Sequence, residues 1–291
     1  MKIKQIKIEK LFGLEKNDFD IECYPNENIT ILYAFNGAGK STLLELISSI
    51  SKNTKAILKK CSFKSLELSF DNDKIITVEK ANPASIDFTY RINGKVADES
   101  MLAEMQKEFK VTAIFANKDY NRGLASLKNG SMFPPDAAAP NPIVKIEHEL
   151  PAKLKDPAQR KKVEELRDII NKNFTMTFKH LEILDDKFMA VPDSKYPDDP
   201  ELPIHELSSG EIKLILMFYE LLFETEPHSI LLLDEPESSL HVDWQKKLLT
   251  AVIDVCTKHD IQIIAATHSP DVVEDYFTQL TPMLSKRYES K

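Results

Sequence analysis

The stretch that decides the predicted fold is "AFNGAGKST", Ala34–Thr42. It follows "NITILYA" (Asn28–Ala34), a short apolar run with the length of a buried strand. Apolar residues at helical spacing begin at Leu43, so a helix is expected to start near Lys40. A glycine-bearing loop between a buried strand and a helix is the setting of a phosphate-binding P-loop. The order of strand, loop and helix therefore predicts a P-loop at residues 34–42.

The side chains of this loop suit a nucleotide phosphate. Gly37 and Gly39 allow backbone N–H groups to curl around a β-phosphate. Lys40 can reach the β- and γ-phosphate oxygens, and the Ser41 hydroxyl can ligate Mg²⁺. The predicted phosphate-binding residues are Asn36, Gly37, Ala38, Gly39, Lys40, Ser41 and Thr42.

One position departs from the usual pattern, because Ala34 stands where G-x-x-x-x-G-K-[ST] has its first glycine. If that position needed a positive φ, alanine would cost about 1–2 kcal/mol. Either the backbone is ordinary there or the loop is slightly altered. The structural alternative for the whole stretch is a glycine-bearing turn before a helix.

Two further apolar runs end in polar residues. "ILLLDE" (Ile230–Glu235) ends in adjacent carboxylates, and "IIAATHSPD" (Ile263–Asp271) places a histidine directly after a strand. Ligands of open α/β sheets bind at the carboxyl ends of strands. We therefore expect Asp234 to address Mg²⁺, Glu235 to polarise a water for attack on a γ-phosphate, and His268 to sense that phosphate. Read alone, an acidic pair or a histidine at a strand end is often only structural.

The stretch "HELSSGEIKLILMFYELLF" (His205–Phe223) predicts a buried helix, because it is apolar almost all round. Ser208 or Ser209 alone would supply a capping oxygen. The extra small residues leave backbone N–H groups bare at the positive end of a helix dipole, where an anion can bind. We predict that Ser208, Ser209, Gly210 and Glu211 meet the γ-phosphate held by another copy of the chain. The alternative is a plain N-cap.

Composition excludes several classes of protein. The 291 residues are 42% apolar and 29% charged with a net charge of −8, as in a soluble globular protein that is not a general polyanion binder. The three cysteines lack CxxC spacing, which argues against a zinc site or a disulfide framework. No stretch approaches the roughly 18 apolar residues of a membrane span, and the N-terminus is unlike a signal peptide. We expect a cytoplasmic protein without a membrane partner.

The chain is expected to form a core with an insertion. Residues 1–115 and 205–291 contain alternating strand-like and helix-like stretches, which predicts an α/β core. We also expect this core to carry an antiparallel β subdomain. Ten of the sixteen prolines lie between Pro134 and Pro203 and flank a charged helix near residues 158–173. We read residues 116–204 as an inserted helical lobe with stiff, proline-bearing connections and room for a β-hairpin.

Together these motifs resemble an ABC-type ATPase. The Walker A is "AFNGAGKST", the signature "LSSGE", the Walker B "ILLLDE", the D-loop region "PESSLH" and the switch histidine "ATHSP", in the order and spacing of that family. "DEPESSLH" and "THSP" are similar to the soluble branch that contains the RecF, SMC-like and OLD (overcoming lysogenization defect) ATPases, including AAA family ATPases of bacterial anti-phage defence systems.

The resemblance implies a P-loop NTPase fold with a mixed central sheet, and a head-to-tail homodimer that closes around two ATP molecules and opens on hydrolysis to ADP and phosphate. It assigns phosphate and Mg²⁺ binding to Lys40, Ser41 and Thr42, metal support to Asp234 and the catalytic base to Glu235. His268 would sense the γ-phosphate and Ser238–His241 would couple the two sites. The family's Q-loop glutamine is missing, and Asn117 or Asp119 could take its place. Phe12 is the candidate for an aromatic residue that stacks on adenine.

Four functions compete. The first is an ATP-driven switch that controls a separate effector protein, a nuclease or toxin in phage defence, since residues 271–291 are too short for the nuclease domain of OLD proteins. The second is a DNA-repair or chromosome-associated ATPase, kept open by five lysines and no acid in residues 51–64, and it predicts strongly salt-dependent DNA binding. A transporter ATPase subunit is disfavoured by the missing glutamine and by "PESSLH". An inactive scaffold is disfavoured because Lys40, Glu235 and His268 are all present.

Overall fold

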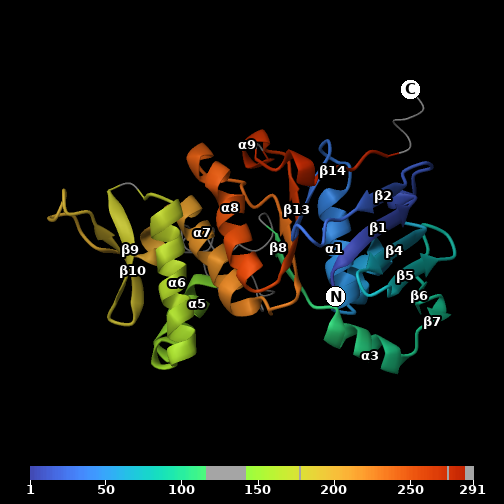
Figure 1. The fold of residues 1–291 in the computed structure, drawn as a ribbon, viewed down its shortest axis with the longest axis horizontal. Helices are drawn as coiled ribbons and strands as arrows, with labels where there is room; N and C mark the ends of the chain where they lie inside the picture. Colours follow the sequence, from blue (N-terminus) through green and yellow to red (C-terminus); the bar gives the residue numbers. More distant parts are fainter. Residues whose placement is uncertain (116–141, 177, 274, 286–291) are drawn as a thin grey trace, which may run out of the picture. The chain divides into compact units, whose positions relative to one another are not determined.

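The computed structural model describes residues 1–115, 142–176, 178–273 and 275–285 (Figure 1). The chain divides into two compact units. Unit 1 consists of Met1–Ile114, Thr225–Pro236 and Ile253–Lys291. Unit 2 consists of Phe115–Glu224 and Glu237–Val252.

Unit 1 contains a six-stranded antiparallel sheet. Its strand order is β2-β1-β4-β5-β6-β7. Every second residue of β4 (Leu66, Leu68 and Phe70) is buried, which is the period-two pattern of a sheet with one face on a core. The strands are β1 Ile3–Glu9, β2 Phe19–Glu22, β4 Ser65–Phe70, β5 Ile75–Lys80, β6 Phe88–Ile92 and β7 Lys95–Val96.

The second sheet of unit 1 has five strands in the order β14-β3-β13-β12-β8. Strand β3 pairs in parallel with β14 and β13, and β13 pairs in parallel with β12. All residues of β12 and β13 are buried, as expected for central strands of a parallel sheet. The strands are β3 Ile29–Tyr33, β8 Val111–Phe115, β12 Ile230–Asp234, β13 Gln262–Thr267 and β14 Leu280–Pro282.

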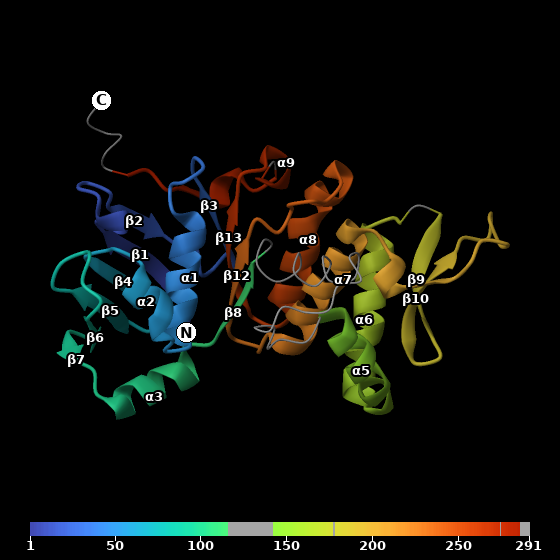
Figure 2. The ribbon, with the colours of Figure 1, turned by 180° about the vertical axis from the view of Figure 1, so that it is seen from behind.

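Helices and a buried side chain join the two sheets. Helix α1 (Lys40–Ser51) packs on β12, and Figure 2 shows α2 (Lys55–Lys60) beside it. The buried amide of Gln262 in β13 accepts a hydrogen bond from the Ile3 N–H at 2.7 Å and donates one to the Ile3 carbonyl at 2.8 Å. The remaining helical segments of unit 1 are Leu11–Gly13, α3 Glu99–Glu108, α9 Pro270–Val273 and Phe277–Gln279.

Unit 2 combines helices with a three-stranded antiparallel sheet of order β11-β10-β9. The turn between β9 and β10 has positive φ at both Asp185 and Asp186, which is the geometry of a two-residue type I′ hairpin. The Phe174 ring lies 5.7 Å from that of Phe218 and 6.4 Å from that of Trp244 in the core of this unit. The elements are α5 Pro142–Lys155, α6 Pro157–Asn173, β9 Lys179–Leu184, β10 Lys187–Pro192, β11 Leu202–Pro203, Ile204–Glu206, α7 Ser209–Tyr219, the π-helical turn Glu220–Glu224, and α8 Val242–Lys258 as far as Val252.

The expected division of the chain differs from these compact units at two places. Residues 205–224, which contain helix α7, and residues 237–252 are expected in the core but belong to unit 2. The predicted domains, a core of residues 1–115 and 205–291 and an inserted lobe of residues 116–204, stay a prediction. Part of the proline-bearing stretch is helical, because Pro142 opens α5, where a missing N–H costs nothing, and Pro151 lies inside it.

Candidate nucleotide-binding site

The loop between β3 and α1 has the backbone that its glycines predict. Gly37 and Gly39 have φ of 79° and 102°, values that residues with a Cβ rarely adopt. A Cβ on Gly39 would lie 2.6 Å from Leu11 and 3.2 Å from the Phe12 ring. Ala34 is not among the residues with positive φ, so its backbone is ordinary and the missing glycine causes no strain there.

Lys40 stands at the centre of a cluster of predicted catalytic side chains. Its ammonium group donates to the Ala34 carbonyl at 3.0 Å and lies 2.7 Å from Nε2 of His268. The same Nε2 is 3.4 Å from Oε1 of Glu235. The three residues lie far apart in the sequence, and the ends of β12 and β13 bring two of them to the first turn of α1. The structure therefore gathers Lys40, Glu235 and His268 in one place.

A second contact joins the two predicted metal ligands. The Ser41 hydroxyl donates to Oδ1 of Asp234 at 2.8 Å, and Asp234 is buried at the end of β12. Mg²⁺ prefers oxygen ligands and is often held by one or two carboxylates together with substrate phosphates. A hydroxyl and a carboxylate side by side at the P-loop fit that ion.

The residue after Asp234 has an unusual backbone. Glu235 has φ of 47°, in the left-handed region, while its N–H donates to the Ala266 carbonyl at 2.8 Å. A side-chain-bearing residue in a sparsely populated region costs about 1–3 kcal/mol, and such residues cluster at functional sites. This conformation holds the Glu235 side chain near His268.

The predicted signature residues form a separate cluster, in unit 2. Ser208 caps α7: its hydroxyl accepts from the Glu211 N–H at 3.4 Å, and the Glu211 carboxylate accepts from the Ser208 N–H at 2.8 Å. This is a capping box. Glu211 is buried and also pairs with Lys179 at 3.1 Å. Within the described residues, the N–H groups of Ser209 and Gly210 have no acceptor; Ser209 is exposed, whereas Gly210 is buried.

Gly210 allows a close approach between α7 and the predicted D-loop region. A Cβ added there would lie 3.3 Å from the Ser239 carbonyl and 3.5 Å from the Trp244 ring. Ser239 itself has a positive φ of 66°. The glycine predicted for phosphate binding therefore also has a packing reason to be a glycine.

One residue of this cluster was missed by sequence reasoning. Lys213 is 5% exposed, and its ammonium group donates to the Ser238 carbonyl at 2.6 Å and to the Ser238 hydroxyl at 2.8 Å. The signal was present, since a lysine within an otherwise apolar helix must find a partner. Lys213 connects the signature helix directly to the residues expected to couple the two sites.

The remaining candidates divide into three groups. Asn36, Ala38 and Thr42 lie in the loop and in the first turn of α1. Phe12 is 42% exposed beside Gly39, where it borders the P-loop. Asn117 and Asp119, the substitutes for the Q-loop glutamine, lie outside the described residues.

Comparison with known proteins identifies the family. Residues 122–274, more than half of the chain, match the family described as "AAA domain, putative AbiEii toxin, Type IV TA system". The chain belongs to this family. The matched part contains the signature residues, Asp234, Glu235 and His268, whereas the P-loop precedes it.

Curated relatives of this AAA family member are distant. The Septu protein PtuA of Bacillus thuringiensis is 24% identical over 310 residues, covering 94% of this chain and 73% of that protein. The UvrABC system protein A of Clostridium acetobutylicum is 24% identical over 279 residues, covering 89% of this chain. The chain spans only 29% of that second relative.

Solved structures show the same fold. An Smc head bound to the C-winged helix domain of ScpA superposes with a TM-score of 0.64 at 15% identity and covers 98% of both chains. The SMC head domain from Thermotoga maritima gives 0.55 at 14% identity, covering 98% of this chain and 97% of that one. The predicted fold, an α/β P-loop NTPase fold of the ABC-ATPase type, is confirmed. In the described part of the chain, no helix has the length and apolarity to cross a membrane.

Proposed function

We propose that the chain binds and hydrolyses ATP and works as a switch that dimerises around two ATP molecules and controls a separate effector protein. The observation that carries this proposal is the contact of Lys40 with His268, and of His268 with Glu235, at the end of a parallel sheet. Three residues from distant parts of the sequence meet there beside a P-loop. An inactive scaffold would have no reason to gather them.

Each residue has a role that follows from its chemistry. The Lys40 ammonium group binds phosphate oxygens, and the N–H groups around Gly37 and Gly39 surround the β-phosphate. The Glu235 carboxylate accepts a proton from the attacking water, and His268 hydrogen-bonds the γ-phosphate. Ser41 and Asp234 would hold Mg²⁺, which when bound neutralises charge that builds up on the phosphates.

The dimer is inferred from the signature end of α7. The capping box uses the N–H groups of Ser208 and Glu211 and leaves those of Ser209 and Gly210 for an anion. Each hydrogen bond to a charged oxygen contributes about 1.5–3 kcal/mol. A γ-phosphate held by a second copy is the anion that would make this end of the helix depend on ATP. A shift of α7 on phosphate binding would then reach Ser238 through its hydrogen bonds with Lys213.

The effector and the biological setting are inferred from the relatives. One relative is named a Septu protein, and the family description names a toxin. We infer that the effector, a nuclease or toxin, is a separate polypeptide and that the switch serves anti-phage defence.

The test of the enzymatic part is phosphate release from ATP by purified protein. We expect Mg²⁺-dependent release that stops when EDTA removes the metal and falls about 10²–10³-fold in Lys40→Ala, since the lysine stabilises transition-state charge. Lys161→Ala, an exposed lysine on α6, is the matched control and should keep full activity. Equal activity of Lys40→Ala and Lys161→Ala would contradict the proposal.

A second candidate is an ATPase that acts on duplex DNA. It is favoured by the similarity to a UvrABC system protein and by exposed lysines in residues 51–64. This candidate predicts affinity for a duplex oligonucleotide that falls steeply with rising salt. A switch that acts only on a protein predicts negligible affinity for the same duplex.

A further inference from the structure

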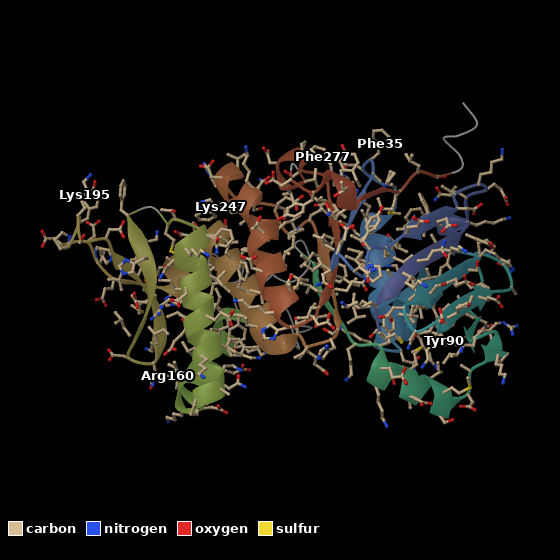
Figure 3. All side chains as sticks on the ribbon, in the orientation of Figure 1. Phe35, Tyr90, Arg160, Lys195, Lys247 and Phe277 are labelled. Carbon is tan, nitrogen blue, oxygen red and sulfur yellow. The ribbon has the colours of Figure 1, made fainter. Side chains whose placement is uncertain are left out.

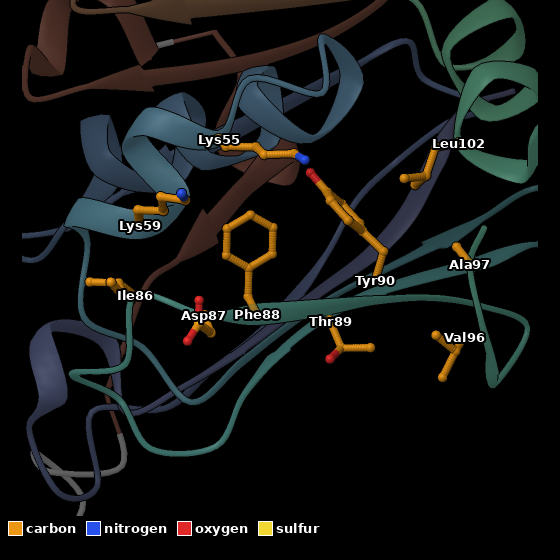
Figure 4. Close-up of a pocket in the computed structure, with 10 residues that line it drawn as sticks. All are labelled: Lys55, Lys59, Ile86, Asp87, Phe88, Thr89, Tyr90, Val96, Ala97 and Leu102. Atoms are coloured by element: carbon orange, nitrogen blue, oxygen red, sulfur yellow. The ribbon is translucent and has the colours of Figure 1, made fainter. Parts of the chain in front are cut away.

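A pocket in unit 1 shares no residue with the predicted nucleotide site. Its volume is about 440 Å³, and it is bordered by α2, β6 and the residues just before it, the end of β7, and α3. Figure 4 shows Lys55 and Lys59 on one side and Phe88 and Tyr90 on the other. The chemistry of these side chains suggests what the pocket binds.

Tyr90 presents an unsatisfied hydrogen-bonding group in this pocket. The residue is 6% exposed. Among the described residues, the Tyr90 hydroxyl is the only buried side-chain hydroxyl group without a hydrogen-bond partner. Leaving a buried polar group unpaired costs about 1–3 kcal/mol. Burial raises the pKa of Tyr90 to about 12, so the hydroxyl keeps its proton at neutral pH and can donate it. In Figure 4 the Lys55 side chain extends toward this hydroxyl.

The two lysines add positive charge to the same pocket. Lys55 and Lys59 are exposed, and neither forms an ion pair or hydrogen bond within the described part of the chain. The single acid in the lining is Asp87. Ile86 and Val96, which are 64% and 60% exposed, form an apolar border. A donor, two cations and an apolar border suit a carboxylate presented by a peptide better than the smooth backbone of a duplex.

The chain itself carries a segment of complementary charge. The loop between β10 and β11 contains Asp198, Asp199 and Glu201, all exposed and all without ion pairs among the described residues. Pro197 and Pro200 restrict its backbone, which lowers the entropy lost when such a loop binds. Lys195, labelled in Figure 3, lies in the same loop.

We propose that the pocket of Lys55, Lys59 and Tyr90 binds the acidic loop Asp198–Glu201 of a second copy of the chain. The two lysines pair with carboxylates of the loop, and the Tyr90 hydroxyl donates to one of them. A pocket on one copy and a loop on the next form a heterologous interface, which closes into a ring or extends into a larger assembly. This interface needs no nucleotide and is therefore independent of the proposed ATP-bound dimer.

The test is a charge swap, measured by sedimentation velocity over a range of concentrations in nucleotide-free buffer of low salt. We expect wild-type protein to associate, and the pocket variant Lys55→Glu/Lys59→Glu and the loop variant Asp198→Lys/Asp199→Lys each to lose at least tenfold in association. Mixing the two variants should restore it, because the basic loop of one then meets the acidic pocket of the other. The control Lys161→Glu/Lys172→Glu, with the same charge change on exposed lysines of α6, should associate like wild type.

Further variants test the hydroxyl and the competing ligand. Tyr90→Phe keeps the ring and should weaken association about tenfold, as expected for one charge-assisted hydrogen bond. A monomer at every concentration, or a mixture that fails to associate, would overturn the proposal. So would binding of a duplex oligonucleotide that Lys55→Glu/Lys59→Glu abolishes while self-association is unchanged, since the pocket would then serve nucleic acid. Because no nucleotide is present, none of these results depends on the ATP switch.

Discussion

The P-loop cluster and the signature cluster use polar side chains in opposite ways. Around Lys40, the polar groups contact one another at the ends of strands that are held by their own buried apolar residues. Around Ser208, the same residues that form the motif also hold the structure, through a capping box and a glycine packed against Ser239.

Because of this difference, we expect substitutions in the two clusters to affect activity and stability differently. Replacing a side chain of the P-loop cluster should remove chemistry and leave the fold intact. Replacing a side chain of the signature cluster that itself makes a structural contact, such as Ser208 or Lys213, should lower the free energy of unfolding, and activity should fall as well. The comparison therefore predicts which variants affect the melting temperature and which do not.

The largest expected effect is that of Glu235→Gln on hydrolysis. Loss of the general base should lower the rate of phosphate release about 10²–10⁴-fold. ATP should still bind, because the amide keeps the size of the carboxylate, and the melting temperature should stay within a degree or two. Rate, affinity and thermal unfolding measured on one preparation check this. A melting temperature that falls as far as in the signature variants would remove the distinction between the clusters.

Next comes Lys213→Met in the signature helix. The change removes two hydrogen bonds from a buried ammonium group to Ser238, so the free energy of unfolding should fall by about 2–4 kcal/mol. Denaturant unfolding measures it, with Lys161→Met on α6 as the exposed control. An unfolding free energy that matches the control would show that Lys213 contributes nothing to stability.

Ser208→Ala should have a smaller effect of the same kind. Loss of the N-cap oxygen should lower the free energy of unfolding by about 1 kcal/mol. Ser209→Ala is the matched control, since the Ser209 hydroxyl caps nothing, and it should leave stability unchanged. Thermal unfolding of the two variants compares them directly. Equal melting temperatures would contradict the assignment of Ser208 as the cap.

The smallest expected effect tests how far the P-loop cluster extends. Phe12 borders Gly39 with 42% of its surface exposed, so its ring is available to stack on adenine. Phe12→Ala should weaken ATP binding about 3–10-fold and leave stability unchanged, as expected for one aromatic contact. Titration calorimetry measures the affinity, and Phe277→Ala, an exposed phenylalanine labelled in Figure 3, is the control. Equal affinities of the two variants would exclude stacking on Phe12.

The sequence predicted the P-loop cluster because each of its parts is a local pattern. A short apolar run predicts a buried strand, and a carboxylate or histidine directly after it must lie at the sheet edge. Asp234, Glu235 and His268 follow this rule. Ala34 could not be settled in advance, because only the backbone shows that its φ is ordinary.

The details of the signature cluster and of the Tyr90 pocket could not be predicted, because they depend on contacts between residues distant in the sequence. From the sequence, either Ser208 or Ser209 could be the N-cap of α7. The structure shows that it is Ser208, because the Ser208 hydroxyl accepts a hydrogen bond from the Glu211 N–H. The pairs Lys213–Ser238 and Lys179–Glu211 join segments 25 and 32 residues apart, and no local pattern predicts such partners. The unpaired Tyr90 hydroxyl is likewise visible only once its surroundings are known.

The measurement that tests the central claim most directly is the mass in solution of Glu235→Gln with and without Mg-ATP, by light scattering. Raised salt and low protein concentration keep the proposed pocket–loop association out of the result. The variant should bind ATP without hydrolysing it, so we predict a shift from monomer to dimer that Ser209→Arg abolishes. A mass that does not respond to ATP would contradict the switch: a constant monomer would exclude the ATP-bound dimer for this chain alone, and a constant dimer would place the association elsewhere.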